Sequence, residues 1–169
     1  MKLGPRALAR RITGVMVMLL AVGPAIIVSA PAAEAAPSAA TVARYEARVI
    51  ARMNYMRHYY GRRDLSGGSC PDRYAEWYAP VLAHKVLVHR QPWTMRLHQN
   101  MYTILRGCRA TVAAENLAAG PQSADQTVAA WMHSPGHRAN ILDRRLNRVG
   151  VAAVYRGGAW FVVADFTRQ

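Results

Sequence analysis

The stretch Trp131-Met-His-Ser-Pro-Gly-His-Arg-Ala-Asn-Ile-Leu142 decides the fold of this chain. Ser134-Pro135 is typical of a helix start, because serine favours the capping position and proline is tolerated in the first turn. The pair therefore predicts a short helix with His137 in its first turn. Two other motifs accompany this stretch: Ala114-Glu-Asn-Leu-Ala-Ala-Gly120 precedes it, and a hairpin ending in Trp160-Phe-Val-Val-Ala-Asp-Phe166 follows it.

In this order, the three blocks resemble the CAP superfamily of cysteine-rich secretory proteins, venom antigens and plant pathogenesis-related proteins. The resemblance covers roughly residues 41–167 and is strongest after Ala114. It implies an α+β fold, in which a three-layer α-β-α sandwich encloses a short antiparallel sheet. It also implies that Glu115 and His137, which match the family's Glu and His pair, face one cleft. Asn54 and Arg57 form an N-x-x-R pair that is similar to the first-helix pattern of many members.

Apolar residues at three- and four-residue spacing predict further helices. These helices run from Thr41, as the capping residue, to about Tyr60, from Cys70 onward, from Met95 to Leu105 and from Ser123 through Trp131. Pro80 lies inside the second helix and is expected to kink or split it, because proline cannot donate the helical hydrogen bond. A strand is expected at Ala114–Ala119. Gly157-Gly158 permits the positive φ angles of a tight turn between two final strands.

The same spacing predicts which side chains are buried. The expected apolar face of the first helix consists of Tyr45, Val49, Met53, Met56 and Tyr60. The expected apolar face of the second helix consists of Tyr74, Trp77, Tyr78, Val81 and Leu82. The aromatic residues Trp131, Trp160 and Phe166 are expected in the core.

The amino-terminal residues 1–35 are predicted to be a secretory signal peptide. A basic segment is followed by the apolar run Ile12–Val28 and by Ala33-Glu34-Ala35, which is a small-residue cleavage pattern. The alternative is a membrane anchor, but Gly23-Pro24 interrupts the run and would break a helix there. We therefore expect a secreted or envelope-associated protein with no stable membrane span after cleavage. Residues 36–40 are then a linker, and residues 41–169 are one CAP-like domain.

The chain is strongly basic, with a net charge of +13. Removal of residues 1–35 leaves a net charge of +10, from 18 basic and 8 acidic residues. Such a charge favours contact with an anionic cell-envelope surface or with lipid headgroups. The charges are scattered along the sequence, however, and we therefore favour an arginine-rich composition that aids solubility as their explanation. We expect no nucleic-acid partner, because no nucleic-acid-binding module is visible.

The two cysteines, Cys70 and Cys108, are predicted to form a disulfide. An even pair in an exported chain is typical of a disulfide. The bond would close a loop of about 39 residues and would stabilise the fold by roughly 4 kcal/mol in the chain-entropy model. The alternative, a metal site or a reactive thiol, lacks a CxxC motif or a nearby histidine at ligand spacing.

The candidate cleft is expected to contain a third family residue, a histidine after the second helix. His98 and His89 compete for this position, and we favour His98 for its spacing before Cys108. His98, Glu115 and His137 could then make an open three-ligand site for zinc. The family's fourth position, a Glu three residues after the helix tryptophan, is Ser134 here, which weakens such a site. The alternative is a structural hydrogen bond between Glu115 and His137.

Three functions are compatible with these residues. The first is a secreted binding module whose cleft holds a metal ion or a small polar or lipid ligand. The second is a metal-assisted hydrolase of peptides or cell-wall material, and the third is a cationic structural protein of the envelope. Binding is favoured over catalysis because the chain has neither a G-x-S-x-G elbow nor an H-E-x-x-H motif. Ser134 is accordingly interpreted as a helix cap and not as a nucleophile.

Overall fold

The computed structural model describes residues 36–89 and 97–169, which belong to one unit, Glu34–Gln169. The predicted signal peptide and the expected helix start at Met95 lie outside the described residues. The elements are α1 (Ala39–Tyr59), β1 (Ser66–Gly67), α2 (Ser69–Val88), α3 (Met101–Gly107), β2 (Val112–Ala119), α4 (Ala124–His133), α5 (Pro135–Leu142), β3 (Arg148–Arg156) and β4 (Ala159–Arg168). Within residues 36–89 and 97–169, no helix is long and apolar enough to cross a membrane.

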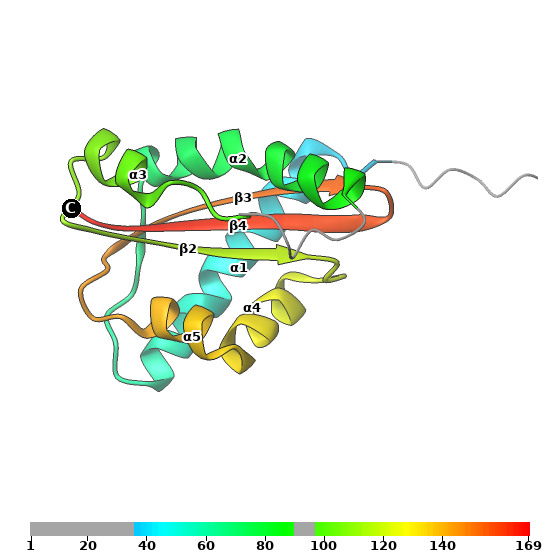
Figure 1. Ribbon diagram of the computed structural model, residues 1–169. Helices are drawn as coiled ribbons and strands as arrows, with labels where there is room; N and C mark the ends of the chain where they lie inside the picture. The colour runs from blue at the N-terminus through cyan, green and yellow to red at the C-terminus, as the bar shows by residue number, and fades with distance from the viewer. Residues whose placement is uncertain (1–35, 90–96) are drawn as a thin grey trace, which may run out of the picture. The chain divides into compact units, whose positions relative to one another are not determined.

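The sheet has the strand order β1-β3-β4-β2. Strands β3 and β4 form the predicted hairpin and pair antiparallel, as do β2 and β4, whereas the two-residue β1 pairs parallel with β3. The sheet is therefore mixed rather than wholly antiparallel. Helix α2 covers one face, and α1, α4 and α5 cover the other (Figure 1). The predicted three-layer α-β-α sandwich is confirmed.

Each face of the sheet has its own hydrophobic core. Between the sheet and α1, α4 and α5, the largest buried side chains include Met53, Trp131 and Phe166. Between the sheet and α2, Leu82 packs with Phe161 and Val163. Trp131, Trp160 and Phe166 are all buried, as predicted. Side chains therefore alternate along β4 between the two cores, as the pleat of a strand requires.

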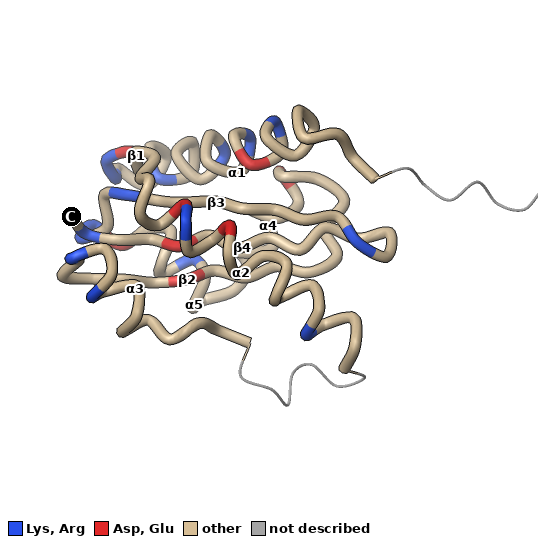
Figure 2. The backbone as a smooth tube through the Cα atoms, turned by 90° about the horizontal axis from the view of Figure 1, so that it is seen from above, with Lys and Arg blue, Asp and Glu red and all other residues tan. Residues whose placement is uncertain are grey.

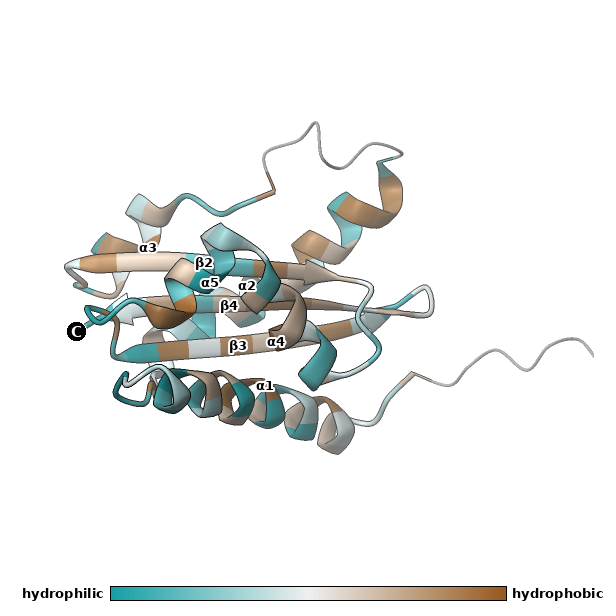
Figure 3. Ribbon diagram, turned by 90° about the horizontal axis from the view of Figure 1, so that it is seen from below, coloured by the Kyte–Doolittle hydropathy of each residue, from teal (hydrophilic) through white to brown (hydrophobic). Residues whose placement is uncertain are grey.

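Two predicted core residues prove to be exposed. Tyr60 follows the end of α1 and is 36% exposed, while Trp77 on α2 is 64% exposed. Instead, Arg57 occupies the inner face of α1 and is only 1% exposed. Figure 3 shows hydrophilic and hydrophobic segments alternating along α1. Tyr60 lies past the end of α1, whereas Trp77 lies in the middle of α2 at the side of its buried stripe, which consists of Ala75, Tyr78, Ala79, Leu82 and Ala83. Apolarity alone shows neither where a helix ends nor which alanines make the closest contacts.

The helix boundaries correct three predictions. Ser38, and not Thr41, caps α1 by accepting a hydrogen bond from the Thr41 backbone N–H, so the expected linker 36–40 already contains the helix start. Helix α2 runs through Pro80 without being split. Its neighbours Ala79 and Ala83 are buried against the sheet, and this packing offsets the missing hydrogen bond. Helix α3 begins only at Met101, because the Asn100 side chain caps it.

Three local features complete the domain: a disulfide, a tight turn and a close contact between α2 and the sheet. The predicted Cys70–Cys108 disulfide is present and joins the first turn of α2 to the end of α3, with a Cα–Cα distance of 5.6 Å. In the β3–β4 turn, Gly157 and Gly158 both have positive φ, as predicted. Gly150 on β3 lies against the backbone of Pro71 and Asp72, where a Cβ would collide. The amino terminus of α2 therefore packs directly on the sheet.

Candidate functional site

The centre of the candidate site is the buried carboxylate of Glu115 on β2. Its Oε1 accepts hydrogen bonds from His98 Nδ1 at 2.8 Å and from the Gln99 backbone N–H at 3.1 Å. Its Oε2 accepts one from Gln99 Nε2 at 2.7 Å. His98 and Gln99, which precede α3, are thereby fixed to the edge strand of the sheet. The prediction that His98 meets Glu115 is confirmed, and His89 is instead the exposed residue that ends α2.

A second buried acid, Asp165, lies opposite Glu115. The two residues are register partners on β4 and β2, and Gln99 Nε2 also donates to Asp165 Oδ2 at 2.9 Å. The pKa of Asp165 is raised to about 8, chiefly by burial and in addition by the charge of Glu115, against the opposing effect of the Gln99 hydrogen bond. Asp165 is therefore mostly protonated at neutral pH. Its Oδ1 has no hydrogen-bond partner among the described residues.

His137 approaches this site from the opposite layer. It lies in the first turn of α5, and its backbone carbonyl accepts a hydrogen bond from Asn116 Nδ2 on β2 at 3.1 Å. Asn140 Nδ2 donates to Asn116 Oδ1 and to the Glu115 carbonyl, at 2.9 and 3.2 Å. Three side-chain amide contacts thus hold α5 against the strand that carries Glu115. This layer arrangement follows from the alternation along β2, which points Glu115 and Asn116 to opposite faces.

The two histidines have opposite pKa shifts. The hydrogen bond to Glu115 is the main cause that raises the pKa of His98, although burial lowers it. Burial lowers the pKa of His137, and the charge of His98 lowers it further. The imidazoles are therefore within electrostatic range of each other at the β2 edge. As the pH falls, His98 is protonated before His137.

The described residues do not fit the predicted zinc site. Within residues 36–89 and 97–169, no three His, Cys, Asp or Glu side chains form a group that could hold a metal ion. Both carboxylate oxygens of Glu115 are already engaged in the hydrogen bonds described above, and the bond of His98 through Nδ1 leaves only Nε2 of that ring as a metal ligand. The structure thus shows a hydrogen-bonded acid–imidazole pair, in place of the three-ligand set expected from the sequence.

A pocket adjoins the exposed side of this network. It has a volume of about 260 Å³ and lies between α2 and the segment that begins α3. Its walls are Tyr74, Trp77, Tyr78, Lys85, His98, Gln99, Asn100 and Thr103. Lys85 Nζ donates to the Tyr78 hydroxyl at 2.8 Å and lies 5.0 Å from the centre of that ring. The pocket combines aromatic faces with the cationic end of Lys85 and the 54% exposed side chain of His98.

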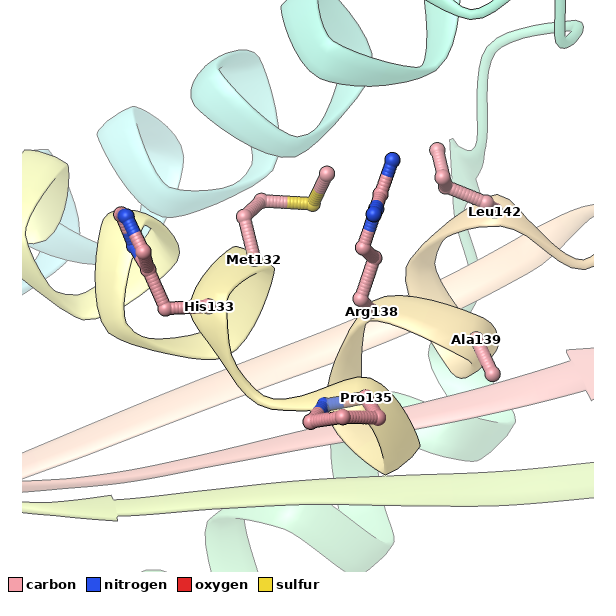
Figure 4. Close-up of a pocket in the computed structure, with 6 residues that line it drawn as sticks. All are labelled: Met132, His133, Pro135, Arg138, Ala139 and Leu142. Atoms are coloured by element: carbon pink, nitrogen blue, oxygen red, sulfur yellow. The ribbon is translucent and has the colours of Figure 1, made fainter.

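A second pocket, between α4 and α5, has a volume of about 350 Å³ and is shown in Figure 4. His133 and Arg138 line it, but none of the predicted cleft residues does. His133 Nδ1 donates to the Ala129 carbonyl of its own helix at 2.7 Å. Ser134 occupies the N-cap position of α5 as predicted, yet its side chain makes no capping hydrogen bond. The structure therefore shows no hydrogen bond that would pair Ser134 with either neighbouring histidine as a catalytic base.

Sequence reasoning missed two members of the network, Gln99 and Asp165. Asp165 carried a usable signal, because it is the only charged residue in the apolar run Trp160–Phe166 and a buried acid needs a partner. Gln99 carried none, since a glutamine beside a histidine is ordinary in a surface loop. Its position between two carboxyl groups appears only after folding.

A sheet flanked by helices on both faces agrees with the fold that the sequence implied. Residues 30–166 match the cysteine-rich secretory protein family, abbreviated CAP. The chain belongs to this family. A relative from Bacillus subtilis (strain 168), the uncharacterized protein YkwD, is 30% identical over 125 residues. That match covers 74% of this chain and 48% of the relative, so the chain spans about half the length of the curated relative it matches.

Solved structures share the fold at low identity. An outer surface protein from Borrelia burgdorferi superposes with a TM-score of 0.61 at 16% identity, covering 80% of this chain and 98% of that one. An extracellular protein containing an SCP domain from Bacillus anthracis gives 0.60 at 20%, covering 79% and 44%. A cysteine-rich secretory protein from Staphylococcus aureus gives 0.58 at 15%, covering 78% and 41%. These similarities establish the architecture and leave the ligand open.

Proposed function

We propose that this CAP domain is exported and acts as a binding module for a small ligand with a flat apolar part and an acidic group. The pocket beside His98 is the observation that carries this proposal. Its aromatic walls suit a flat apolar surface, whereas Lys85 and His98 suit an anionic group. Its volume of about 260 Å³ is at the lower end for ligand pockets, which favours a small molecule over a whole lipid.

The network around Glu115 explains how the pocket would keep its shape. Three hydrogen bonds to one buried carboxylate fix His98 and Gln99, which form one wall, and the disulfide joins the two helices that bound the pocket. A wall that is ordered before binding loses less entropy when a ligand arrives. Trp77, by contrast, is 64% exposed on the opposite wall and offers an uncovered ring.

Three observations support export. The sequence predicts a signal peptide, the disulfide is typical of an oxidising compartment, and two solved relatives are described as an extracellular and an outer surface protein. No observation favours the hydrolase alternative over binding. The cationic-envelope alternative concerns the basic surface of the domain outside the pocket beside His98.

Native mass spectrometry of the exported protein tests the proposal. We expect a bound small molecule that is lost in Trp77→Ala, because Trp77 provides the uncovered wall of the pocket. Tyr102→Ala is the matched control, since Tyr102 is 61% exposed on α3 but does not line the pocket. Retention of the ligand by Trp77→Ala, or its equal loss from both variants, would contradict this location.

Calorimetry with zinc tests the metal prediction separately. Wild type and His98→Ala are compared, and His89→Ala serves as the control because His89 is exposed and takes no part in the hydrogen bonds of Glu115. We expect no zinc binding that depends on His98, because no three His, Cys, Asp or Glu side chains of the described residues group around one metal position. Binding that is lost only in His98→Ala would restore zinc as the ligand of the cleft.

A further inference from the structure

Two adjoining pockets lined by arginine lie where the loops after α1 and α5 meet. The first has a volume of about 430 Å³ and is lined by Gly61, Arg62, Arg63 and Arg144. The second, of about 300 Å³, is lined by Arg63, Asp64, Ser66, Arg144, Leu146, Asn147, Arg148 and Arg168. Because the pockets share Arg63 and Arg144, they form one concave surface, here called the arginine groove. Basic segments gather at this end of the domain in Figure 2.

The guanidinium groups of the groove are largely uncommitted. Within residues 36–89 and 97–169, the side chains of Arg63 and Arg144 form neither a hydrogen bond nor an ion pair. Arg148 and Arg168 make only long contacts of 3.4 Å to backbone carbonyls, and Arg62 donates through Nε to the Leu142 carbonyl at 3.0 Å. Asp64 is the acidic side chain that lines the groove, so five arginines face one carboxylate.

The backbone beneath these arginines is held rigidly by α1. The buried guanidinium of Arg57 donates to the carbonyls of Arg63, Ile141, Asp143 and Leu146, at 2.6, 2.7, 3.0 and 3.2 Å. Asn54 bonds both the N–H and the carbonyl of Leu65, at 2.8 and 2.9 Å. The N-x-x-R pair of α1 thus fixes the loops on both sides of the groove. Their exposed arginines are presented from a preorganised frame, which lowers the entropic cost of binding.

The adjacent Arg145, unlike Arg144, is paired with an acidic side chain. Arg145 binds Asp143 through a 2.7 Å contact and does not line either pocket. The neighbouring Arg144 faces the groove without such a partner. The local positive charge that lacks an acidic partner therefore lies in the arginine groove, although the basic residues are scattered in the sequence.

We propose that the arginine groove binds a linear chain of phosphate groups. Planar guanidinium forks match phosphate oxygens in a bidentate manner, which a scattered set of ammonium groups would not. A concave groove admits a single extended chain. No lining residue is aromatic, so nucleic-acid bases would find no stacking partner. The groove shares no residue with the pocket beside His98, and this proposal does not depend on the proposed function.

The experiment measures binding of inorganic polyphosphate to the full chain as a function of salt. We expect Arg63→Gln/Arg144→Gln to bind at least about tenfold more weakly, with a shallower salt dependence, because two phosphate contacts are lost. Arg44→Gln/Arg156→Gln is the matched control, since it removes the same charge from exposed residues that line neither pocket of the groove. Its affinity should change by less than about twofold.

A lysine variant separates charge from geometry, and vesicles and single-stranded DNA serve as competing ligands. Arg63→Lys/Arg144→Lys keeps the charge but loses the fork, and its affinity should lie between wild type and the Gln variant. Equal weakening by the Gln variant and its control, or no polyphosphate binding at low salt, overturns the proposal. So does tighter binding to phosphatidylglycerol vesicles or to single-stranded DNA with the same dependence on Arg63 and Arg144. Circular dichroism confirms that all variants are folded.

Discussion

Glu115 and Asp165, register partners on neighbouring strands, are both hydrogen-bonded to the same side-chain nitrogen, Nε2 of Gln99. Two buried carboxyl groups at adjacent positions cannot both carry a charge without a large cost. The raised pKa of Asp165, about 8, resolves this conflict by placing a proton on one of them. Gln99, which lines the candidate ligand pocket, is therefore hydrogen-bonded to a protonated acid, Asp165.

Asp165 should make the stability of the domain depend on pH. Its folded pKa of about 8 lies above the ordinary value of 3.8, so at neutral pH the folded state binds a proton that the unfolded state has released. The stabilisation that comes from this bound proton is fully present below pH 3.8. It is lost as the pH rises through about 8. Asp165→Asn mimics the protonated form and should become more stable than wild type as the pH rises from 5 to 9.

Urea unfolding at several pH values measures this difference. Asp125→Asn is the control, because it also removes one carboxylate but from a side chain that is 49% exposed. A constant difference between wild type and Asp165→Asn across the range would show that Asp165 is ionised throughout. The same result in both variants would assign the effect to net charge.

The two cleft histidines should titrate in a definite order. The pKa of His98 is raised by its hydrogen bond to Glu115, and the pKa of His137 is lowered by burial. In a titration followed by nuclear magnetic resonance, His98 should therefore lose its proton at a higher pH than His137. Glu115→Gln removes the carboxylate and should lower the pKa of His98. The reverse order, or no response of His98 to that substitution, would contradict the observed pair.

The close approach of α2 to the sheet predicts a large effect at Gly150. A Cβ there would collide with the backbone of Pro71 and Asp72, which cannot rotate away as a side chain could. Gly150→Ala should lower the free energy of unfolding by about 1–3 kcal/mol, or more if α2 is displaced. Gly136→Ala is the control, because the new methyl group would meet nothing within 4 Å.

Thermal or urea unfolding compares the two glycine variants. Gly136 lies inside α5, so its replacement by alanine should be neutral or slightly stabilising through helix propensity. If Gly150→Ala were as stable as Gly136→Ala, α2 would not pack against β3 as closely as described.

Ser123 and Ser134 occupy the N-cap positions of α4 and α5, but they should contribute differently to the free energy of unfolding. The Ser123 side chain accepts a hydrogen bond from the Gln126 N–H at 3.2 Å, whereas Ser134 makes no such bond. Ser123→Ala should therefore lower the free energy of unfolding by about 1 kcal/mol, and Ser134→Ala should have little effect. Equal losses measured by urea unfolding would indicate that Ser134 also caps its helix in solution. Labelling of Ser134 by a fluorophosphonate would instead identify it as a nucleophile.

Signals that act over a few residues were readable from the sequence. Ser134-Pro135 marked the start of α5, and Gly157-Gly158 marked the hairpin turn, because capping, proline and positive φ are properties of neighbouring residues. The order of the three motifs identified the family, and the spacing before Cys108 favoured His98 over His89 as the histidine beside Glu115. The cysteine count, together with the expected export, was enough to predict the disulfide.

Only the tertiary structure decided which polar residues are buried and what they hold. Arg57 bonds to Ile141, 84 residues away, and Gln99 bonds to Asp165, 66 residues away. Hydrophobic periodicity cannot reveal such partners, because it records the face of one element and not the segment packed against it. For the same reason the arginines of the groove look scattered in the sequence. Their gathering on one concave surface is a consequence of the loops that Arg57 joins.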